Sequence, residues 1–219
     1  EGAATVLRRI RRGEAWQVAA DAVYPGGSYG NGAAMRAPVL ALFYARDRSE
    51  LVAAARDSAK VTHAHPLGVE GAVLIALATH ALQELRGSSE VLNRVESHCS
   101  APEILAKLKL VREWIEEDRN PRPLEVARRL GNGTTVESSC ATALYISLRH
   151  LDLPFEEMIE FILSCRGDTD TIGAMAGALW GVANGAERIP KVRLEARKAL
   201  EEVALQLFRR NVATWDAPQ

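Results

Sequence analysis

Apolar residues recur at intervals of three or four along most of this chain, which is the spacing of one face of an α-helix. The clearest stripes of apolar positions lie at 73–85, 104–115, 141–148 and 200–207. Alternating apolar and polar residues bounded by turn residues, which mark half-buried strands, are hard to find. Glycines and prolines cluster between the stripes, and they predict about ten helices joined by short loops. The pattern predicts an all-α fold.

Residues 173–184 form the most unusual of these stretches. They are small and apolar on almost every side, which predicts a central helix that is buried all round. Gly173, Gly177 and Gly181 recur every four residues, and we expect their face to admit the backbone of a neighbouring helix. The same glycine spacing occurs in membrane helices, but this segment is too short and its flanks are too polar for a membrane span.

The composition is that of an ordinary globular protein, with 47% hydrophobic and 25% charged residues in a chain of 219. Neither a shift in composition nor an internal repeat divides the chain, so we expect one helical domain over residues 1–219. A net charge of −1 gives no general attraction to nucleic acid or to an anionic membrane. No apolar run approaches the roughly 18 residues that a membrane span needs. The widely spaced Cys99, Cys140 and Cys165 are expected to be reduced thiols in a cytoplasmic protein.

The pentapeptide Gly-Asp-Thr-Asp-Thr at 167–171 carries the strongest chemical signal. We expect Asp168, Asp170 and Thr171 to lie just before the buried helix, where their oxygens are the hard ligands that Mg²⁺, Mn²⁺ or Ca²⁺ prefer. Capping of the helix is the alternative, because Asp and Thr accept hydrogen bonds from free backbone N–H groups. One Asp is enough for a cap, and a second carboxylate is costly to desolvate without a cation or several donors. The pentapeptide therefore favours a divalent-metal site.

Three kinds of metal site have acidic motifs of this type. An EF-hand is excluded, because Ile172 and Leu179 occupy positions 5 and 12 counted from Asp168, and position 12 requires a bidentate Glu. A phosphatase of the haloacid-dehalogenase type would use Asp168 as its nucleophile, but it needs a buried strand before the motif and βα units after it. A two-metal site shared between distant parts of a helical bundle is the third possibility.

A glycine-rich loop at 26–32 is the second candidate site. Its backbone N–H groups can point at an anion, and the N-terminus of a following helix favours negative charge. Tyr29 can stack on a base, while Ser28 and Asn31 can bind phosphate or sugar hydroxyls. An ordinary polar turn is the alternative interpretation. A Rossmann fingerprint is excluded because no strand precedes the loop.

Two histidines follow at 62–68, in the order Thr-His-Ala-His-Pro-Leu-Gly. Zinc is disfavoured here, because cysteine and carboxylate ligands at zinc spacing are absent from the sequence. Capping of the preceding helix by His63 is the plain structural interpretation.

Segments 27–36, 62–68 and 167–178 together, in this order and spacing, resemble the ADP-ribosylglycohydrolase family. The form Gly-Ser-Tyr-Gly-Asn-Gly is most similar to the branch that removes ADP-ribose from serine and cleaves poly(ADP-ribose). The resemblance implies an orthogonal all-α bundle that holds two Mg²⁺ or Mn²⁺ ions and hydrolyses the glycosidic bond between ADP-ribose and a protein side chain or related acceptor. It implies Asp168, Asp170 and Thr171 as metal ligands. For ADP-ribose or an ADP-ribosylated protein it implies Gly27, Ser28, Tyr29, Gly30, Asn31, Gly32 and His63.

Two departures from the family pattern shape the expectation. The early Thr-Asp-Asp-Thr segment of the family, and the Glu before it that assists catalysis, have no counterpart among these residues. We therefore expect this chain to be the C-terminal two-thirds of such a domain. The acid–base Glu is expected in the N-terminal part, which would then be a partner of this chain. This chain alone is expected to have little activity. Arg166 stands where the family usually has a second glycine, and its charge is expected to oppose cation binding. A non-catalytic ADP-ribose-binding module, the phosphatase and a purely structural helical protein are the rival hypotheses.

Overall fold

The computed structural model describes residues 2–85, 87–190 and 195–213, the last four of them by their backbone alone. No strand occurs in these residues, whose single β pairing is an isolated bridge between Gly30 and Thr135. The all-α expectation is confirmed. The α-helices are α1 (Gly2–Arg11), α2 (Trp16–Val23), α3 (Gly32–Arg36), α4 (Pro38–Phe43), α5 (Arg48–Lys60), α6 (Pro66–Glu84), α7 (Ser88–Glu96), α8 (Pro102–Glu116), α9 (Pro123–Leu130), α10 (Cys140–Arg149), α11 (Phe155–Cys165), α12 (Thr169–Asn184) and α13 (Arg197–Ala213). The 3₁₀ helices are η1 (Val136–Ser138) and η2 (Ala186–Arg188).

The helix boundaries follow from local chemistry. Helices α4, α6, α8 and α9 each begin with a proline, whose fixed φ suits the first turn and whose missing N–H needs no partner there. The Asp47 side chain caps α5 by accepting a hydrogen bond of 2.9 Å from the Glu50 N–H. Helices α9 and α12 end at Gly131 and Gly185, both at positive φ, which glycine adopts without a steric cost.

Helix α6 contributes more buried residues than any other described helix and lies at the centre of the packing. It contacts α3, α4 and α5 on one side and α7, α10 and α12 on the other. The sequence-based expectation that no segment is long and apolar enough to cross a membrane is wrong for α6, which has a mean hydropathy of 1.2. However, 72% of that stretch is buried inside the protein, so packing of α6 in the core explains its apolar composition.

The predicted helix at 173–184 exists, but it differs from the prediction in two respects. Helix α12 begins at Thr169, one turn earlier than predicted, and it buries one face, formed by Ile172, Met175, Ala176, Leu179 and Trp180. The glycine face is open at 173 and 181, where added side-chain atoms would meet nothing within 4 Å in the described chain, and at 177 an added Cβ would lie 3.8 Å from the Phe155 ring. The prediction of burial all round, with a helix backbone against the glycines, is therefore wrong for the residues that the structure describes.

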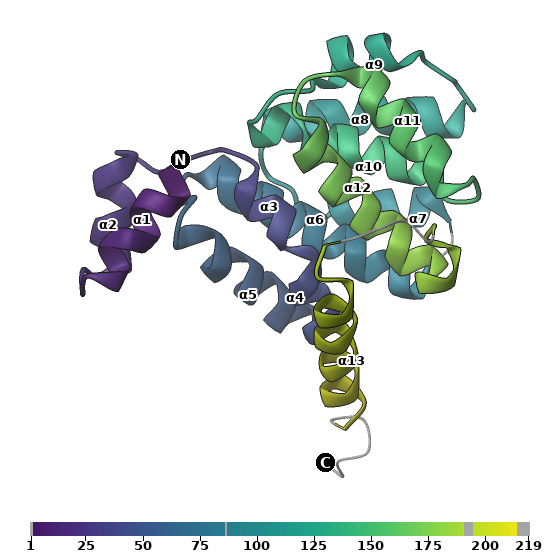
Figure 1. Cartoon of the computed structure of the whole chain (residues 1–219). Coiled ribbons are helices and arrows are strands. Elements are labelled where there is room, and N and C mark those ends of the chain that lie inside the picture. The colour runs from purple at the N-terminus through teal and green to yellow at the C-terminus, as the bar shows by residue number, and fades with distance from the viewer. Residues whose placement is uncertain (1, 86, 191–194, 214–219) are drawn as a thin grey trace.

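Figure 1 shows how the helices are arranged around α6. The hairpin of α1 and α2 lies at one side of the molecule, helices α7 to α12 gather at the other, and α13 projects away from the main body. One core cluster contains buried residues from each of the helices α6 through α12, and a second contains buried residues of α3, α4, α5 and α6. Leu200 and Val203 on the apolar stripe of α13 are 60% and 63% exposed, so that stripe packs little against the described core.

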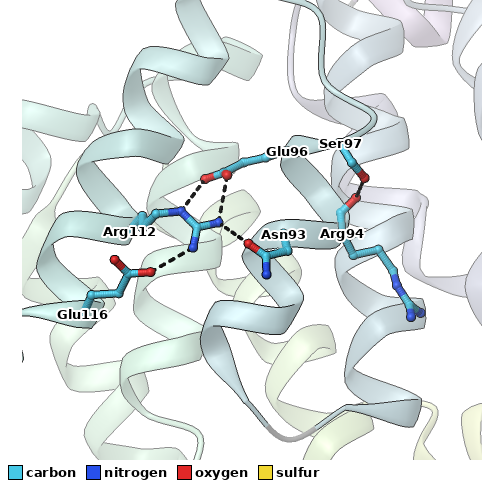
Figure 2. A network of polar contacts seen from close by, with 6 residues as sticks. All are labelled: Asn93, Arg94, Glu96, Ser97, Arg112 and Glu116. Carbon is cyan, nitrogen blue, oxygen red and sulfur yellow. Dashed lines mark hydrogen bonds and ion pairs between the residues drawn. The ribbon is translucent and has the colours of Figure 1, made fainter.

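A polar network on the surface ties α7 to α8 (Figure 2). The Arg112 guanidinium donates to both carboxylate oxygens of Glu96, at 3.2 and 2.8 Å, and to Asn93 Oδ1 at 2.9 Å. Its remaining Nη donates to Glu116 within α8, at 2.9 Å. The planar guanidinium fits this paired geometry, which a lysine would not reproduce. The network holds α7 and α8 together.

Candidate functional site

The glycine-rich loop before α3 is held by a segment far away in the sequence. The Asn31 N–H donates to the carbonyl of Thr134 at 2.9 Å, and the Val136 N–H donates to the carbonyl of Tyr29 at 3.0 Å. Inside the loop, the Gly30 N–H donates to Ser28 Oγ at 3.2 Å. The loop is therefore paired on both sides of Gly30, and its conformation is fixed by the fold.

A cavity of about 550 Å³ opens over this loop, within the range of volumes usual for small-molecule sites. It lies between the start of α1, the end of α2 and the loop that leads into α3. The residues that line it are Gly2, Ala3, Tyr24, Gly27, Ser28, Tyr29, Gly30, Asn31, Gly32, Thr62, His63, Thr134 and Thr135. The structure thus brings together all seven of the predicted substrate-binding residues on one cavity wall.

Tyr29 presents its ring at the rim of the cavity. The side chain is 47% exposed, and its ring packs against the His65 ring with the centroids 5.2 Å apart. His65 caps α6 as well, because its Nδ1 accepts a hydrogen bond of 3.2 Å from the Leu67 N–H. Tyr29 is therefore held from one side and leaves surface for a flat apolar group such as a base.

His63 lies deeper in the cavity and is only 8% exposed. Side-chain atoms added at Gly30 or Gly32 would lie 3.4 or 3.1 Å from its Nε2, so these glycines let the loop lie against the imidazole. Burial, and after it the positive charge of Arg36, lower the pKa of His63 to about 4. The two histidines of segment 62–68 contact different groups: His63 Nδ1 lies against the Thr62 hydroxyl, and His65 Nδ1 accepts from the Leu67 N–H.

Asn31 connects the cavity to the acidic pentapeptide. Its side-chain amide donates to Asp168 Oδ2 at 2.7 Å and to Ser139 Oγ at 3.1 Å. Asn31 is 6% exposed and Ser139 is fully buried, so water competes little for these bonds. Segments 27–32 and 167–171, which are more than 130 positions apart, form one continuous site.

The acidic residues start α12, whereas the sequence predicted them just before it. Asp168 is the residue before the first turn, and its N–H donates to the carbonyl of Asn132 at 2.8 Å. Asp170 and Thr171 lie inside the first turn, where Asp170 is exposed and Thr171 is half-buried. The Asp168 side chain does not cap the helix by a hydrogen bond. Capping alone therefore does not explain this carboxylate.

The two carboxylates lie close enough to interact directly. A side-chain hydrogen bond with Asp168, and then the backbone N–H groups of Thr171 and Asp170, lower the pKa of Asp170. Two neighbouring carboxylates repel each other unless hydrogen-bond donors, a proton or a cation offset their charge. The pair thus provides a site for a positively charged partner.

The donor set of this site fits a hard divalent cation in part. Asp168, Asp170 and Thr171 offer oxygen atoms only, as Mg²⁺ and Mn²⁺ prefer. No group of three or more His, Cys, Asp or Glu side chains in the described residues is arranged to hold a metal ion. These residues can therefore supply one side of a coordination shell.

Arg166 adopts a backbone conformation that is normally reserved for glycine, with φ 59° and ψ −167°. Its side chain is exposed, and it forms no ion pair with Asp168 or Asp170 in the part of the chain that the structure describes. Arg166 therefore does not neutralise the acidic pair through a direct ion pair in these residues, and its opposition to cation binding stays a prediction. Having Arg166 in place of glycine instead strains the backbone at this position.

Replacing Arg166 with glycine is expected to raise the free energy of unfolding by about 1 kcal/mol. Relief of the strained conformation stabilises the native state by roughly 1–3 kcal/mol, and the greater freedom of glycine in the unfolded chain offsets about 0.4–1 kcal/mol of this. Urea unfolding of the two proteins measures the difference. Arg188→Gly, at an exposed position with negative φ, is the control and should not stabilise; equal or lower stability of Arg166→Gly would contradict the strain argument.

The sequence did not identify segment 131–139 as part of the site. This segment supplies the carbonyls of Thr134 and Asn132 and the hydroxyl of Ser139, which together hold the glycine-rich loop and the start of α12. Its only signal in the sequence was the cluster Gly-Asn-Gly at 131–133, which predicted a break between helices. Gly131 is also a point of close approach, since a Cβ there would lie 2.7 Å from Ser138 Cα.

Comparison with known proteins gives consistent results. The family model described as ADP-ribosylglycohydrolase matches residues 1–216. The chain is 35% identical to mouse ADP-ribosylhydrolase ARH3 over 204 residues, covering 80% of this chain and 55% of that protein. With human ADP-ribosylhydrolase ARH3 the identity is 33%, over 80% of this chain and 56% of that protein. The chain therefore spans little more than half the length of these relatives.

A solved structure shares the fold. A chain of an ADP-ribosylglycohydrolase-related protein complex superposes with a TM-score of 0.72 at 23% identity. The match covers 96% of this chain and 69% of that one. At this identity the likeness concerns the arrangement of the helices alone.

Proposed function

This chain belongs to the ADP-ribosylglycohydrolase family, and from that premise we propose that it forms the ADP-ribose-binding part, and one side of the metal site, of an enzyme that hydrolyses the glycosidic bond of ADP-ribose. The hydrogen bond between Asn31 and Asp168 carries this proposal. It joins a cavity suited to a nucleotide diphosphate to a pair of carboxylates suited to a divalent cation. A ligand in the cavity would therefore have one end beside the carboxylates.

Each part of the site has a role that follows from its chemistry. The loop at 27–32 binds the diphosphate through the backbone N–H groups of Ser28, Tyr29 and Gly32, since those of Gly27, Gly30 and Asn31 already donate within the protein. Tyr29 stacks on the adenine at the rim, and His63 reaches the phosphate or the nearer ribose. Asp168, Asp170 and Thr171 would hold Mg²⁺ or Mn²⁺, which supplies a positive charge that orients ribose hydroxyls beside the bond to be cleaved.

The remaining ligands and the acid–base Glu are expected from the portion of the family domain that this chain does not span, since the chain covers 55% of the mouse relative. The glycine face of α12, open in the described chain, is a surface on which that portion can pack. Next to it, Met35, Val39 and Leu42 on α3 and α4 are 43%, 57% and 37% exposed. Burial of such residues stabilises an association by roughly 25 cal/mol per Å² of apolar surface.

Binding of ADP-ribose to the chain of residues 1–219 is the direct test. Calorimetry is expected to show saturable binding that Mg²⁺ tightens roughly tenfold, about 1.4 kcal/mol. Asp170→Asn should remove the effect of Mg²⁺ and leave metal-free binding unchanged, because Asp170 lies outside the cavity lining. Hydrolysis of ADP-ribosyl-serine by this chain alone is expected to be weak or absent.

The outcomes separate the alternatives. Failure to bind ADP-ribose, with or without Mg²⁺, contradicts the proposal. Binding that neither Mg²⁺ nor Asp170→Asn affects would favour a non-catalytic ADP-ribose-binding module. The phosphatase class has a buried strand just before this motif. In the described residues a helix, α11, stands there instead and ends at Cys165, so the structure does not support a phosphatase.

A further inference from the structure

We infer that Arg36 and Thr62 are positioning residues that hold His63 in the neutral tautomer protonated at Nε2, so that this N–H donates into the cavity to an oxygen of ADP-ribose. The inference rests on the proposed function for the identity of the ligand. The tautomer itself follows from a chain of three hydrogen-bonding side chains, whose order of donors and acceptors the geometry determines.

Arg36 begins this chain of hydrogen bonds. Its Nη2 donates to Thr62 Oγ1 at 2.9 Å and to the carbonyl of Ser58 at 2.6 Å, and its Nη1 donates to the carbonyl of Gly32 at 3.3 Å. A guanidinium has donors only and stays charged at any pH at which the protein folds. Thr62 Oγ1 must therefore be the acceptor in its bond with Arg36.

The Thr62 hydroxyl in turn determines which ring nitrogen of His63 carries the proton. Its Oγ1 lies 2.8 Å from His63 Nδ1, and Thr62 is only 6% exposed. Among the described residues, His63 Nδ1 is the acceptor within reach of the Thr62 hydroxyl proton. A proton on Nδ1 would leave that hydroxyl without a protein acceptor, which is unfavourable for a side chain this buried. Nδ1 is therefore unprotonated, and the ring proton is on Nε2.

The Nε2 atom lies on the side of the ring next to the glycine-rich loop. It borders the loop at Gly30 and Gly32, and His63 is part of the cavity lining. In the described part of the chain, Nε2 has no protein partner, whereas Nδ1 has one. A donor N–H without a protein partner at the wall of a cavity is suited to an acceptor oxygen of the ligand.

The surroundings also keep the ring neutral. Burial and the charge of Arg36 lower the pKa of His63 to about 4. Tyr24 and Tyr29 are the other titratable side chains that line the cavity, so no carboxylate among the described lining residues stabilises an imidazolium. Between pH 5.5 and 8, His63 should then donate one hydrogen bond from Nε2 without changing its charge. We expect binding of ADP-ribose to show no His63 titration in this range.

Nitrogen-15 NMR of the imidazole rings tests the tautomer without any ligand. The His63 signals, identified by their loss in His63→Gln, are expected to show Nε2 protonated and Nδ1 unprotonated from pH 5.5 to 8. Thr62→Val keeps the shape of the side chain but removes the hydroxyl, and it should give a mixture of tautomers. It should also weaken binding of ADP-ribose about tenfold. Thr62→Ser restores the hydroxyl and should return both the tautomer and the affinity to within about threefold of the original.

Two results would overturn the inference. One is a wild-type His63 that is protonated at Nδ1, or doubly protonated at pH 6. The other is a Thr62→Val protein that keeps both the single tautomer and the full affinity. If wild-type His63 has the expected tautomer but ADP-ribose does not bind, the proposed function fails while the positioning of His63 by Arg36 and Thr62 stands. The two proposals are therefore tested separately.

Discussion

Gly27→Ala is expected to weaken binding of ADP-ribose by at least about 100-fold, which is roughly 2.7 kcal/mol. Gly27 has φ 88°, and a Cβ there would overlap the backbone nitrogen of His65 and lie 2.5 Å from the carbonyl carbon of Ala64. The left-handed backbone conformation alone costs alanine about 1–2 kcal/mol. The neighbouring atoms belong to the backbone at the start of α6 and cannot move aside as a flexible side chain can. The loop must therefore shift, and its N–H groups lose their alignment with the diphosphate.

Gly26→Ala is the matched control for this prediction. Gly26 also has a positive φ, of 79°, but a Cβ there would meet nothing within 4 Å. This variant carries the conformational strain without the overlap, and we expect its affinity to stay within about fivefold of the original. Calorimetry measures both affinities, and urea unfolding shows that both variants are folded. Similar affinities for the two variants would mean that the contact between Gly27 and His65 does not position the loop.

The fold class was predictable from the sequence because helical periodicity is a local property. The breaks at Pro66, Pro123 and Gly131 fall at helix ends for reasons that single residues carry. The burial of α12 was not predictable, because its small apolar residues fit a covered and an open face equally well. Whether another segment covers Gly173 and Gly181 depends on tertiary packing, which the composition of one helix does not record.

The candidate site was predictable in its residues but not in its connections. Glycine density and paired carboxylates marked segments 27–32 and 167–171, since these residue types carry their chemistry wherever they lie. The bond from Asn31 to Asp168, and the pairing of both segments with residues 131–139, arise only from the folded chain. The tautomer of His63, which lies in the loop between α5 and α6, likewise depends on Arg36, which approaches from helix α3. Sequence motifs thus identified the candidate ligand-binding groups, and the structure added the residues that contact and hold them.

Gly167→Ala is expected to lower the free energy of unfolding by about 3 to 6 kcal/mol. Gly167 has φ 75°, and a Cβ there would overlap the carbonyl oxygen of Asn132 and lie 2.7 Å from its Cγ. That carbonyl accepts the hydrogen bond from the Asp168 N–H at 2.8 Å. Left-handed strain of about 1–2 kcal/mol, overpacking of about 1–3 kcal/mol and the lost hydrogen bond of about 1 kcal/mol act in the same direction. Urea unfolding measures the sum, and hydrogen exchange should show lost protection of the Asp168 amide.

Gly185→Ala, at the other end of α12, separates strain from overlap. Gly185 has φ 80° and ψ 166°, and a Cβ there would meet nothing within 4 Å, so we expect a loss of about 1–3 kcal/mol from strain alone. Protection of the Asp168 amide should be unchanged in this variant, because Gly185 lies at the opposite end of the 16-residue helix α12. Equal losses in the two variants would show that the contact of Gly167 with Asn132 contributes nothing to stability. A larger loss for Gly167→Ala would instead show that the Asn132 backbone supports the acidic pair. Asn132 would then fix where α12 begins, and thereby the positions of Asp168 and Asp170 relative to Asn31.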